Sequence, residues 1–292
     1  MSTRMVATGD VELCVEDFGD PADPTVLLVG GAAMSMDWWD ADLCRRIAAG
    51  GRHVVRYDHR DTGRSTTGSV GTPDYDANAL DRDCVGLVEA LGSPVHVVGL
   101  SSGGGVAQGV ALRRSDLVAS ATLIASAAIG GVDWSTLPGP VQEMAARFED
   151  PPPEPDWSDR DAFVEWALDD QRAYAGTIPL DEARTRELAG QVFDRSIDVA
   201  AAGNHWVAIN SGEADGDPVD VHDLAVPTLV VHGTADPLFP LPHGQALAEA
   251  IPGARLLVVE GMGHQVPPPS TWDLFVPALL EHTAHSRSNG SA

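Results

Sequence analysis

The sequence predicts an α/β fold with a mostly parallel sheet that helices cover on both faces. Short, continuously apolar segments alternate with segments of helical apolar spacing, and strands buried on both faces have this unbroken apolar character. The alternation stops after about residue 128 and resumes near residue 225. We therefore expect a core formed by residues 1–128 and 218–292, with an inserted helical lid at 129–217.

The individual elements follow from the apolar spacing in chain order. An edge strand is expected at 11–18, before a turn rich in Asp and Pro. Apolar runs of four to six residues are too short for helices and indicate buried strands. These strands are expected at 26–29, 53–57, 95–98, 121–124, 227–232 and 255–260, and the helices between and after them at 38–49, 75–91, 106–114, 243–250 and 272–283.

The charge balance limits the classes of partner. Eighteen basic against 43 acidic residues give a net charge of −25, which repels phosphate backbones and anionic membranes. No segment approaches the roughly 20 apolar residues that cross a bilayer. All basic residues are arginines, so Schiff-base chemistry, a pyridoxal-phosphate anchor and a Walker lysine are excluded. We expect a small-molecule partner, and neither nucleic acid nor membrane.

Cysteine usage and the first residues indicate a cytoplasmic protein. Cys14, Cys44 and Cys84 are scattered and odd in number, which fits buried free thiols better than a disulfide framework. The N-terminal residues lack the charged-then-apolar pattern of a secretory signal. Histidines and cysteines show no metal-site spacing, so we expect neither a metal nor a cofactor.

A five-residue turn, Gly99-Leu100-Ser101-Ser102-Gly103, joins an expected strand to an expected helix. A side chain at the apex of so sharp a turn strains its own backbone, and the residues two before and two after it must be small. Gly99 and Gly103 meet this requirement for Ser101. A Gly/Ser-rich loop could carry the same letters by chance, but a strand before and a helix after favour a nucleophile elbow. We predict that Ser101 is the nucleophile.

The neighbouring Ser102 is a rival nucleophile. In that case Leu100 would stand two positions upstream, where its branched side chain would collide with the turn. We therefore assign the Ser102 backbone N–H, rather than its hydroxyl, to the site as one oxyanion donor.

A serine hydroxyl needs a base, and the base needs an orienting group. In open α/β sheets such groups lie on loops beyond the carboxyl ends of strands. Asp236 follows the expected strand at 227–232, and His264 follows the one at 255–260, directly after Gly263, which permits an exposed loop conformation. The chain order serine, acid, histidine is the one expected of this sheet type. Asp236 and His264 are thus the predicted triad partners, with Asp223 as the alternative acid.

A second oxyanion donor should come from the loop Gly30-Gly31-Ala32-Ala33 after the first buried strand. Small residues there let the backbone approach the substrate oxygen, and we assign the Ala32 N–H to this role. Gly31 is expected to line the substrate site beside it.

With these residues assembled, the chain resembles the α/β-hydrolase superfamily over about residues 5–128 and 225–284. The segment 57–65, Tyr-Asp-His-Arg-Asp-Thr-Gly-Arg-Ser, resembles a turn of that family in which charged residues brace neighbouring loops. Residues 9–13, 17–24 and 56–67 are similar to esterases of the aclacinomycin methylesterase type. This resemblance implies an α/β-hydrolase fold and a serine esterase that cleaves the methyl ester of an anthracycline-like polyketide.

Other activities share the same triad. Cofactor-free perhydrolases, lactonases and C–C hydrolases remain alternatives, and so does a non-hydrolytic ligand-binding or biosynthetic homologue. Epoxide hydrolases and haloalkane dehalogenases need a carboxylate nucleophile, which Ser101 excludes. The lid is rich in aromatic residues, which stack on planar rings, so we expect a bulky, largely apolar ester. Trp39, His205 and Trp206 are the predicted pocket contacts, with a structural role as the alternative for His205.

Overall fold

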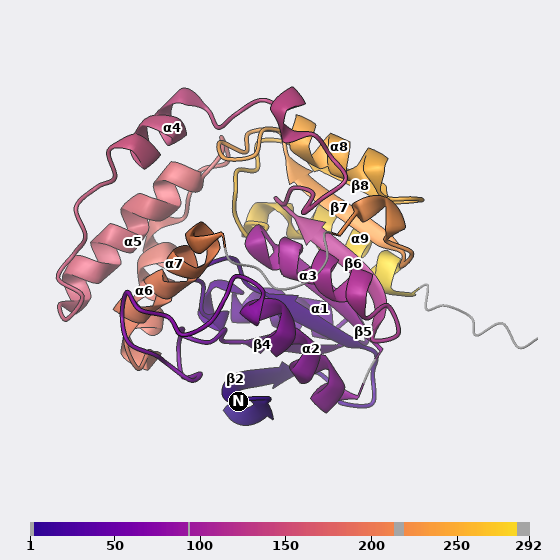
Figure 1. The fold of residues 1–292 in the computed structure, drawn as a ribbon, viewed down its shortest axis with the longest axis horizontal. Helices are drawn as coiled ribbons and strands as arrows, with labels where there is room; N and C mark the ends of the chain where they lie inside the picture. The colour runs from indigo at the N-terminus through magenta and orange to yellow at the C-terminus, as the bar shows by residue number, and fades with distance from the viewer. Residues whose placement is uncertain (1–2, 93, 213–218, 285–292) are drawn as a thin grey trace, which may run out of the picture.

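An eight-stranded sheet forms the centre of the protein, in the order β1-β2-β4-β3-β5-β6-β7-β8 (Figure 1). The computed structural model describes residues 3–92, 94–212 and 219–284. Strands β3 to β8 are parallel to one another, whereas β2 runs antiparallel to both of its neighbours, β1 and β4. The predicted mostly parallel sheet is therefore confirmed. The strands span Thr3–Thr8, Val11–Phe18, Thr25–Val29, His53–Tyr57, Val95–Leu100, Val118–Ile124, Thr228–Gly233 and Arg255–Val259, for β1 to β8.

Two expectations about the sheet edges were wrong. The strand β2 is not an edge strand, because β1 pairs along its outer side through a turn at Gly9, whose φ is 62°. At the other edge, β8 pairs only with β7 and is not buried on both faces, and its Val258 is 40% exposed. An apolar run therefore located β8 correctly but did not reveal its edge position.

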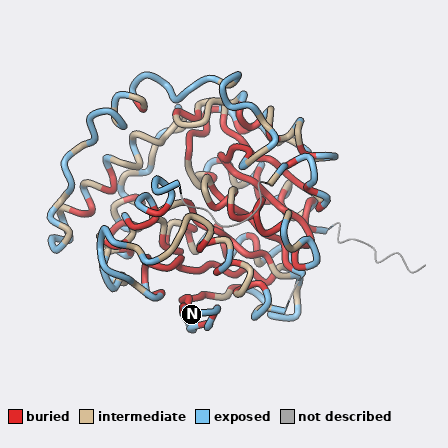
Figure 2. The backbone as a smooth tube through the Cα atoms, in the orientation of Figure 1, coloured by how far each residue is buried: buried red, intermediate tan, exposed pale blue. Residues whose placement is uncertain are grey.

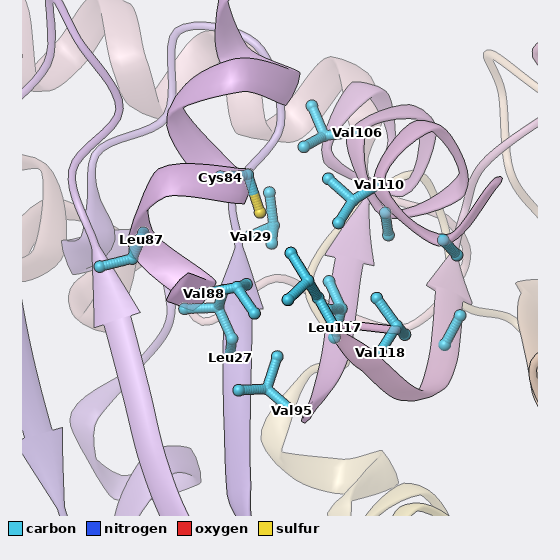
Figure 3. Packing of buried hydrophobic residues seen from close by; sticks show 14 of the residues in the cluster. Leu27, Val29, Cys84, Leu87, Val88, Val95, Val106, Val110, Leu117 and Val118 are labelled. Carbon is cyan, nitrogen blue, oxygen red and sulfur yellow. The ribbon is translucent and has the colours of Figure 1, made fainter. Parts of the chain in front are cut away.

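Alternate residues of the central strands point to opposite faces of the sheet and pack in two separate apolar layers. Both sets of residues are therefore apolar, which explains the unbroken apolar runs. Leu27 and Val29 of β3 pack against α2 (Ala79–Leu91) and α3 (Ser102–Arg113), as Figure 3 shows. Val26 and Leu28 point to the opposite face, against α1 (Ala41–Ala48) and α9 (Trp272–Ala284). The remaining core helix, α8 (Pro242–Ala250), lies on the same side as α2 and α3. The three cysteines are buried and free, as expected.

The helix starts differ from the predictions. Helix α3 begins at Ser102, directly after the turn, and not at 106. Helix α2 begins at Ala79 rather than near 75. The expected helix at 38–49 is a short 3-10 turn, Met36–Trp38, followed by α1, where the Asp40 side chain caps the Asp42 N–H. None of the described helices has the length and apolarity that a bilayer crossing requires.

Among the described residues between β6 and β7, four α-helices lie within the predicted lid. They are α4 (Gln142–Glu149), α5 (Arg160–Tyr174), α6 (Glu182–Arg195) and α7 (Asn204–Ser211), on one side of the sheet in Figure 1. Phe163, Val164 and Val192 centre a small apolar cluster between α5 and α6, which Trp38 of the core joins. The outer side of the lid is largely exposed (Figure 2). Residues 213–217 of the predicted lid and 285–292 of the predicted core lie outside the described residues.

Arginines of α6 fasten the lid to the core. The Arg195 guanidinium contacts Asp37 and Asp58, both buried, at 2.5 and 2.6 Å. Arg184 pairs with Asp40 at 2.9 Å. Asp58 also accepts the backbone N–H groups of Met36 and Arg64 at 2.9 and 3.0 Å. The charged turn at 57–65 thus has the bracing role that its sequence predicts.

Candidate active site

The backbone of Ser101 is strained at the junction of β5 and α3. Its φ is 54° and its ψ is −122°, in a region that residues with a side chain rarely adopt. A Cβ added to Gly99 would lie 2.1 Å from the Gly103 carbonyl oxygen, and one added to Gly103 would lie 2.3 Å from that of Gly30. The two glycines therefore permit the sharp turn, and Gly103 also lets the start of α3 touch the loop after β3.

The three residues predicted as a triad meet at the carboxyl ends of the parallel strands. The His264 Nε2 atom lies 2.8 Å from the Ser101 hydroxyl oxygen. On the other side of the ring, Nδ1 lies 2.9 Å from Asp236 Oδ2 and 3.2 Å from Oδ1. Since the carboxylate can only accept, Nδ1 carries the proton and Nε2 is free to accept from Ser101. Ser102 instead begins α3, and no hydrogen bond joins it to His264.

Backbone groups hold the acid in place. Asp236 Oδ1 accepts the N–H groups of Leu238 and Phe239 at 2.9 and 2.8 Å. His232 donates from Nε2 to the Phe239 carbonyl oxygen at 2.7 Å, so the expectation that His232 supports this loop is confirmed. Burial lowers the pKa of His232, which keeps the ring neutral. The alternative acid, Asp223, is exposed in a 3-10 turn, Val221–Asp223.

The loop that carries His264 is bound to the end of lid helix α5. The His264 N–H donates to the Tyr174 carbonyl oxygen at 2.8 Å. A Cβ on Gly263 would lie 2.2 Å from the Gly176 nitrogen, so the two backbones are in direct contact. The rings of Tyr174 and Phe239 lie 5.8 and 5.3 Å from the imidazole. Phe239, which follows the acid by three residues, was not among the predicted site residues.

The loop at 30–34, here called the oxyanion loop, lies beside Ser101 at Gly31 and contains an unengaged backbone N–H. The Gly31 N–H donates to Met34 Sδ at 3.3 Å, and the Ala33 N–H donates to His205 Nδ1 at 2.9 Å. Between them, the Ala32 N–H has no hydrogen-bond partner among the described residues, and neither has the Ser102 N–H at the start of α3. The two N–H groups predicted as oxyanion donors are thus both unengaged.

Two of the predicted pocket contacts are corrected by their burial. Trp39 is 0% exposed and packs in the core against α1 and α9, so it does not line a substrate site. His205 is 1% exposed, and both of its ring nitrogens are hydrogen-bonded within the protein, which leaves no atom for a substrate. Gly31 does lie at the site, since a Cβ there would be 3.5 Å from Ser101 Cβ. Trp206 is 48% exposed on α7.

His59 is a further residue of the site that the sequence analysis did not name individually. It donates from Nε2 to the Gly30 carbonyl oxygen at 2.9 Å. Burial lowers its pKa to about 4, so the ring is neutral at pH 7. It therefore supports the beginning of the oxyanion loop as His205 supports its end.

A family model described as "Alpha/beta hydrolase family" matches residues 26–278. The chain belongs to the α/β-hydrolase family. Rhodomycin D methylesterase DauP of Streptomyces sp. (strain C5) is 31% identical to this α/β hydrolase over 287 residues, 91% of this chain and 93% of the relative. Rhodomycin D methylesterase DnrP of Streptomyces peucetius is 30% identical over the same shares of both chains.

The fold of this α/β hydrolase is also similar to solved structures. The esterase EaEST of Exiguobacterium antarcticum superimposes with a TM-score of 0.73 at 20% identity, over 96% of this chain and 98% of that one. At this identity the likeness establishes the fold alone.

Proposed function

We propose that this α/β hydrolase is a serine carboxylic-ester hydrolase, with Ser101 as nucleophile, His264 as base and Asp236 as the orienting acid. The observation that carries the proposal is the unbroken relay from Asp236 Oδ2 through His264 to the Ser101 hydroxyl, with contacts of 2.9 and 2.8 Å. Such a relay activates a hydroxyl for acyl transfer. The strained serine at the end of β5 supports the same role.

The geometry supports a two-step reaction. Ser101 Oγ attacks the ester carbonyl carbon while its proton passes to His264 Nε2, and the N–H groups of Ala32 and Ser102 bind the resulting oxyanion. The imidazolium, stabilised by Asp236, then gives its proton to the departing alcohol oxygen. A water molecule attacks the acyl-enzyme with the same base, the acid is released, and the proton returns to Ser101. No step needs a metal or a cofactor.

We propose the methyl ester of a bulky aromatic polyketide as the substrate. The two methylesterase relatives, named for rhodomycin D, support this choice over nearly their whole length. The rings of Tyr174 and Phe239 beside His264 supply apolar, flat surfaces near the reacting atoms. Gly31 and the exposed Trp206 are the remaining proposed substrate contacts. Reduced, buried cysteines and the net charge of −25 support a cytoplasmic enzyme that binds neither nucleic acid nor membrane.

The substitution Ser101→Ala tests the nucleophile. Wild-type protein should hydrolyse an aryl ester and should gain one phosphonyl group from a fluorophosphonate, located at Ser101 by peptide mass spectrometry. Ser101→Ala should lose both properties, with turnover lower by about 10⁴-fold or more, and keep its circular dichroism spectrum. Because Ser102 remains in this variant, labelling that persists would assign the nucleophile to Ser102 and contradict the proposal.

A substrate panel tests the ester class. Methyl esters of planar polycyclic acids should release methanol with a higher kcat/KM than small aliphatic esters. The panel also includes two comparison substrates. A lactone of similar size tests for lactonase activity, and a carboxylic acid supplied with hydrogen peroxide tests for perhydrolase activity. Faster lactone opening or peracid formation would replace the esterase proposal by one of the alternatives that share the triad.

A further inference from the structure

His205 is a lid residue that lies fully inside the core. It is the second residue of α7 and is 1% exposed. Its Nδ1 accepts the Ala33 N–H at 2.9 Å, and its Nε2 lies 2.8 Å from the Arg60 carbonyl oxygen. The ring therefore bridges the oxyanion loop and the turn that follows β4, which lie far from α7 in the sequence.

The two hydrogen bonds define one protonation state. A carbonyl oxygen can only accept, so Nε2 carries the proton, and an N–H can only donate, so Nδ1 offers its lone pair. A doubly protonated ring would turn an N–H towards the Ala33 N–H and break that contact. The titratable and charged groups that face the ring are His59, Arg60 and Asp61. Burial, followed by the effect of His59, lowers the pKa of His205 to about 4, so the bridging form is present at pH 7.

Ala33 is a residue that needs such support. Its φ is 61°, a left-handed conformation that alanine adopts only when its surroundings hold it. The Ala33 N–H belongs to the peptide unit that follows the one carrying the Ala32 N–H, and the two units meet at Ala32 Cα. Holding the first unit therefore restricts the orientations open to the second. At the other end of the loop, the His59 contact with the Gly30 carbonyl oxygen fixes the beginning.

The helix that carries His205 is itself fixed. The side chain of Asn204 donates to Asp61 Oδ2 and to the Ser69 carbonyl oxygen at 3.0 and 3.1 Å, and accepts the Gly71 N–H at 2.7 Å. Tyr75 donates its hydroxyl to the same Asp61 oxygen at 2.6 Å. The imidazole therefore approaches Ala33 from a rigid base.

We infer that His205 is a positioning residue, supplied by the lid, which holds Ala33 so that the Ala32 N–H faces the developing oxyanion. The inference rests on the proposed acyl transfer at Ser101. It assigns to one lid helix, α7, a part in building the oxyanion hole.

Three substitutions separate the two hydrogen bonds of the ring. His205→Leu introduces an apolar side chain of similar bulk and removes both hydrogen bonds. His205→Asn places an amide oxygen near the position of Nδ1 and can still accept from Ala33. His205→Gln places its amide nitrogen near the position of Nε2 and preserves only the contact with Arg60. The control is Arg184→Gln, which breaks the α6 contact with Asp40 and touches no residue of the oxyanion loop.

We expect His205→Leu to lower kcat by roughly 10- to 100-fold, less than or equal to the loss of a whole oxyanion donor, with KM within about threefold. Inhibition by a trifluoromethyl ketone, which forms an oxyanion on Ser101, should weaken by the same factor, while binding of the product acid should not. His205→Asn should recover most of the loss and His205→Gln little of it. Arg184→Gln should change kcat and ketone inhibition by less than about threefold.

Equal kcat and ketone affinity in wild type and His205→Leu would overturn the inference, as would an equal loss of ketone affinity in Arg184→Gln. Nitrogen-15 NMR of wild-type protein gives a readout that needs no substrate: the His205 ring should be neutral with its proton on Nε2, and any other form at pH 7 contradicts the inference. Failure of the proposed function is distinct, since wild-type protein would then neither hydrolyse esters nor react at Ser101.

Discussion

Ser101 combines a strained backbone with contacts that hold the strain in place. Its N–H donates to the Ile124 carbonyl oxygen at 2.9 Å, and its own carbonyl oxygen accepts the Ser126 hydroxyl at 2.9 Å. These contacts on both sides of the residue keep the hydroxyl directed at His264. A flexible loop would have to lose conformational freedom before each attack, whereas this serine is already oriented.

Asp236 is the residue whose substitution best tests the relay. Asp236→Asn keeps the shape but can no longer hold the imidazole with its proton on Nδ1, because the amide can turn a donor towards it. We expect kcat to fall by about 10⁴-fold, measured with an aryl ester at pH 8. The matched control is Asp223→Asn at the exposed alternative acid, for which we expect wild-type kcat. A large fall in kcat for Asp223→Asn, with little change for Asp236→Asn, would instead identify Asp223 as the acid of the relay.

At this scale the triad could be predicted and the supports of the oxyanion loop could not. Asp236 and His264 each follow an apolar strand, so strand ends alone bring them to one edge of the sheet. His205 gives no such signal, because its partners Ala33 and Arg60 lie 172 and 145 residues away. Aromatic character suggested a pocket for Trp39, but the same side-chain area is buried as readily in a core.

Among the elements, the lid is joined to the core by neutral hydrogen bonds and by a few buried charged contacts. Its own apolar cluster is small, and Asp58, which Arg195 contacts, is completely buried. A buried carboxylate without a partner is strongly unfavourable. The two buried acids therefore need the guanidinium as their counter-charge. Burial acts to lower the pKa of Arg195, but the hydrogen bonds and charges of Asp58 and Asp37 outweigh it and raise that pKa above its ordinary value.

Arg195→Gln should lower the free energy of unfolding by about 3–5 kcal/mol, because it leaves Asp37 and Asp58 buried without a counter-charge. Arg160→Gln is the matched control in the same lid. Its pair with Asp194 has a similar distance, 2.7 Å, but side chains that are 47% and 57% exposed, and exposed pairs contribute about 0–1 kcal/mol. Urea denaturation followed by circular dichroism measures both. If both variants lost the same unfolding free energy, burial would not explain the contribution of the Arg195 contacts, and the prediction would be wrong.

Element boundaries show where local sequence is informative. Alternation of apolar runs located the central strands, because each strand residue faces one of two apolar layers. The start of α3 at Ser102 was missed because Gly103, Gly104 and Gly105 are poor helix formers. Close packing against the oxyanion loop requires a glycine at Gly103, which outweighs that propensity.

For the whole molecule, buried neutral histidines link stability to pH. Burial lowers the pKa values of His59, His96 and His205 to about 4 each, from an ordinary value of 6.5. Below about pH 6.5 the unfolded chain binds protons at these sites and the folded chain does not. Their contribution to stability is therefore complete above pH 6.5 and is lost as the pH falls towards 4. Asp81 acts in the opposite direction, because burial raises its pKa to about 6.

His96→Val isolates one of these histidines away from the active site. His96 is 3% exposed in β5, where its Nδ1 lies 2.8 Å from the Ser120 hydroxyl. As the pH falls, the unfolding free energy of the variant should decrease less than that of wild type. The difference between the two proteins should shift in favour of the variant by about 1.4 kcal/mol per pH unit between pH 6 and 4.5. Urea titrations across this range measure the slope. If His96 were already protonated in the folded protein, the unfolding free energies of wild type and His96→Val would change in parallel with pH, which would contradict the prediction.

The sequence by itself determined the alternation of strands and helices in the core from β2 onwards, and it predicted the three residues of the relay. Each of these depends on local patterns: apolar runs, glycine spacing and the position of polar residues just after strands. Only the tertiary structure decided which histidines face which peptide groups, which tryptophan is buried, and how α6 and α7 bind the core. These contacts join side chains more than a hundred residues apart, which come together only when the lid packs on the sheet. A local sequence pattern cannot predict contacts over such a separation.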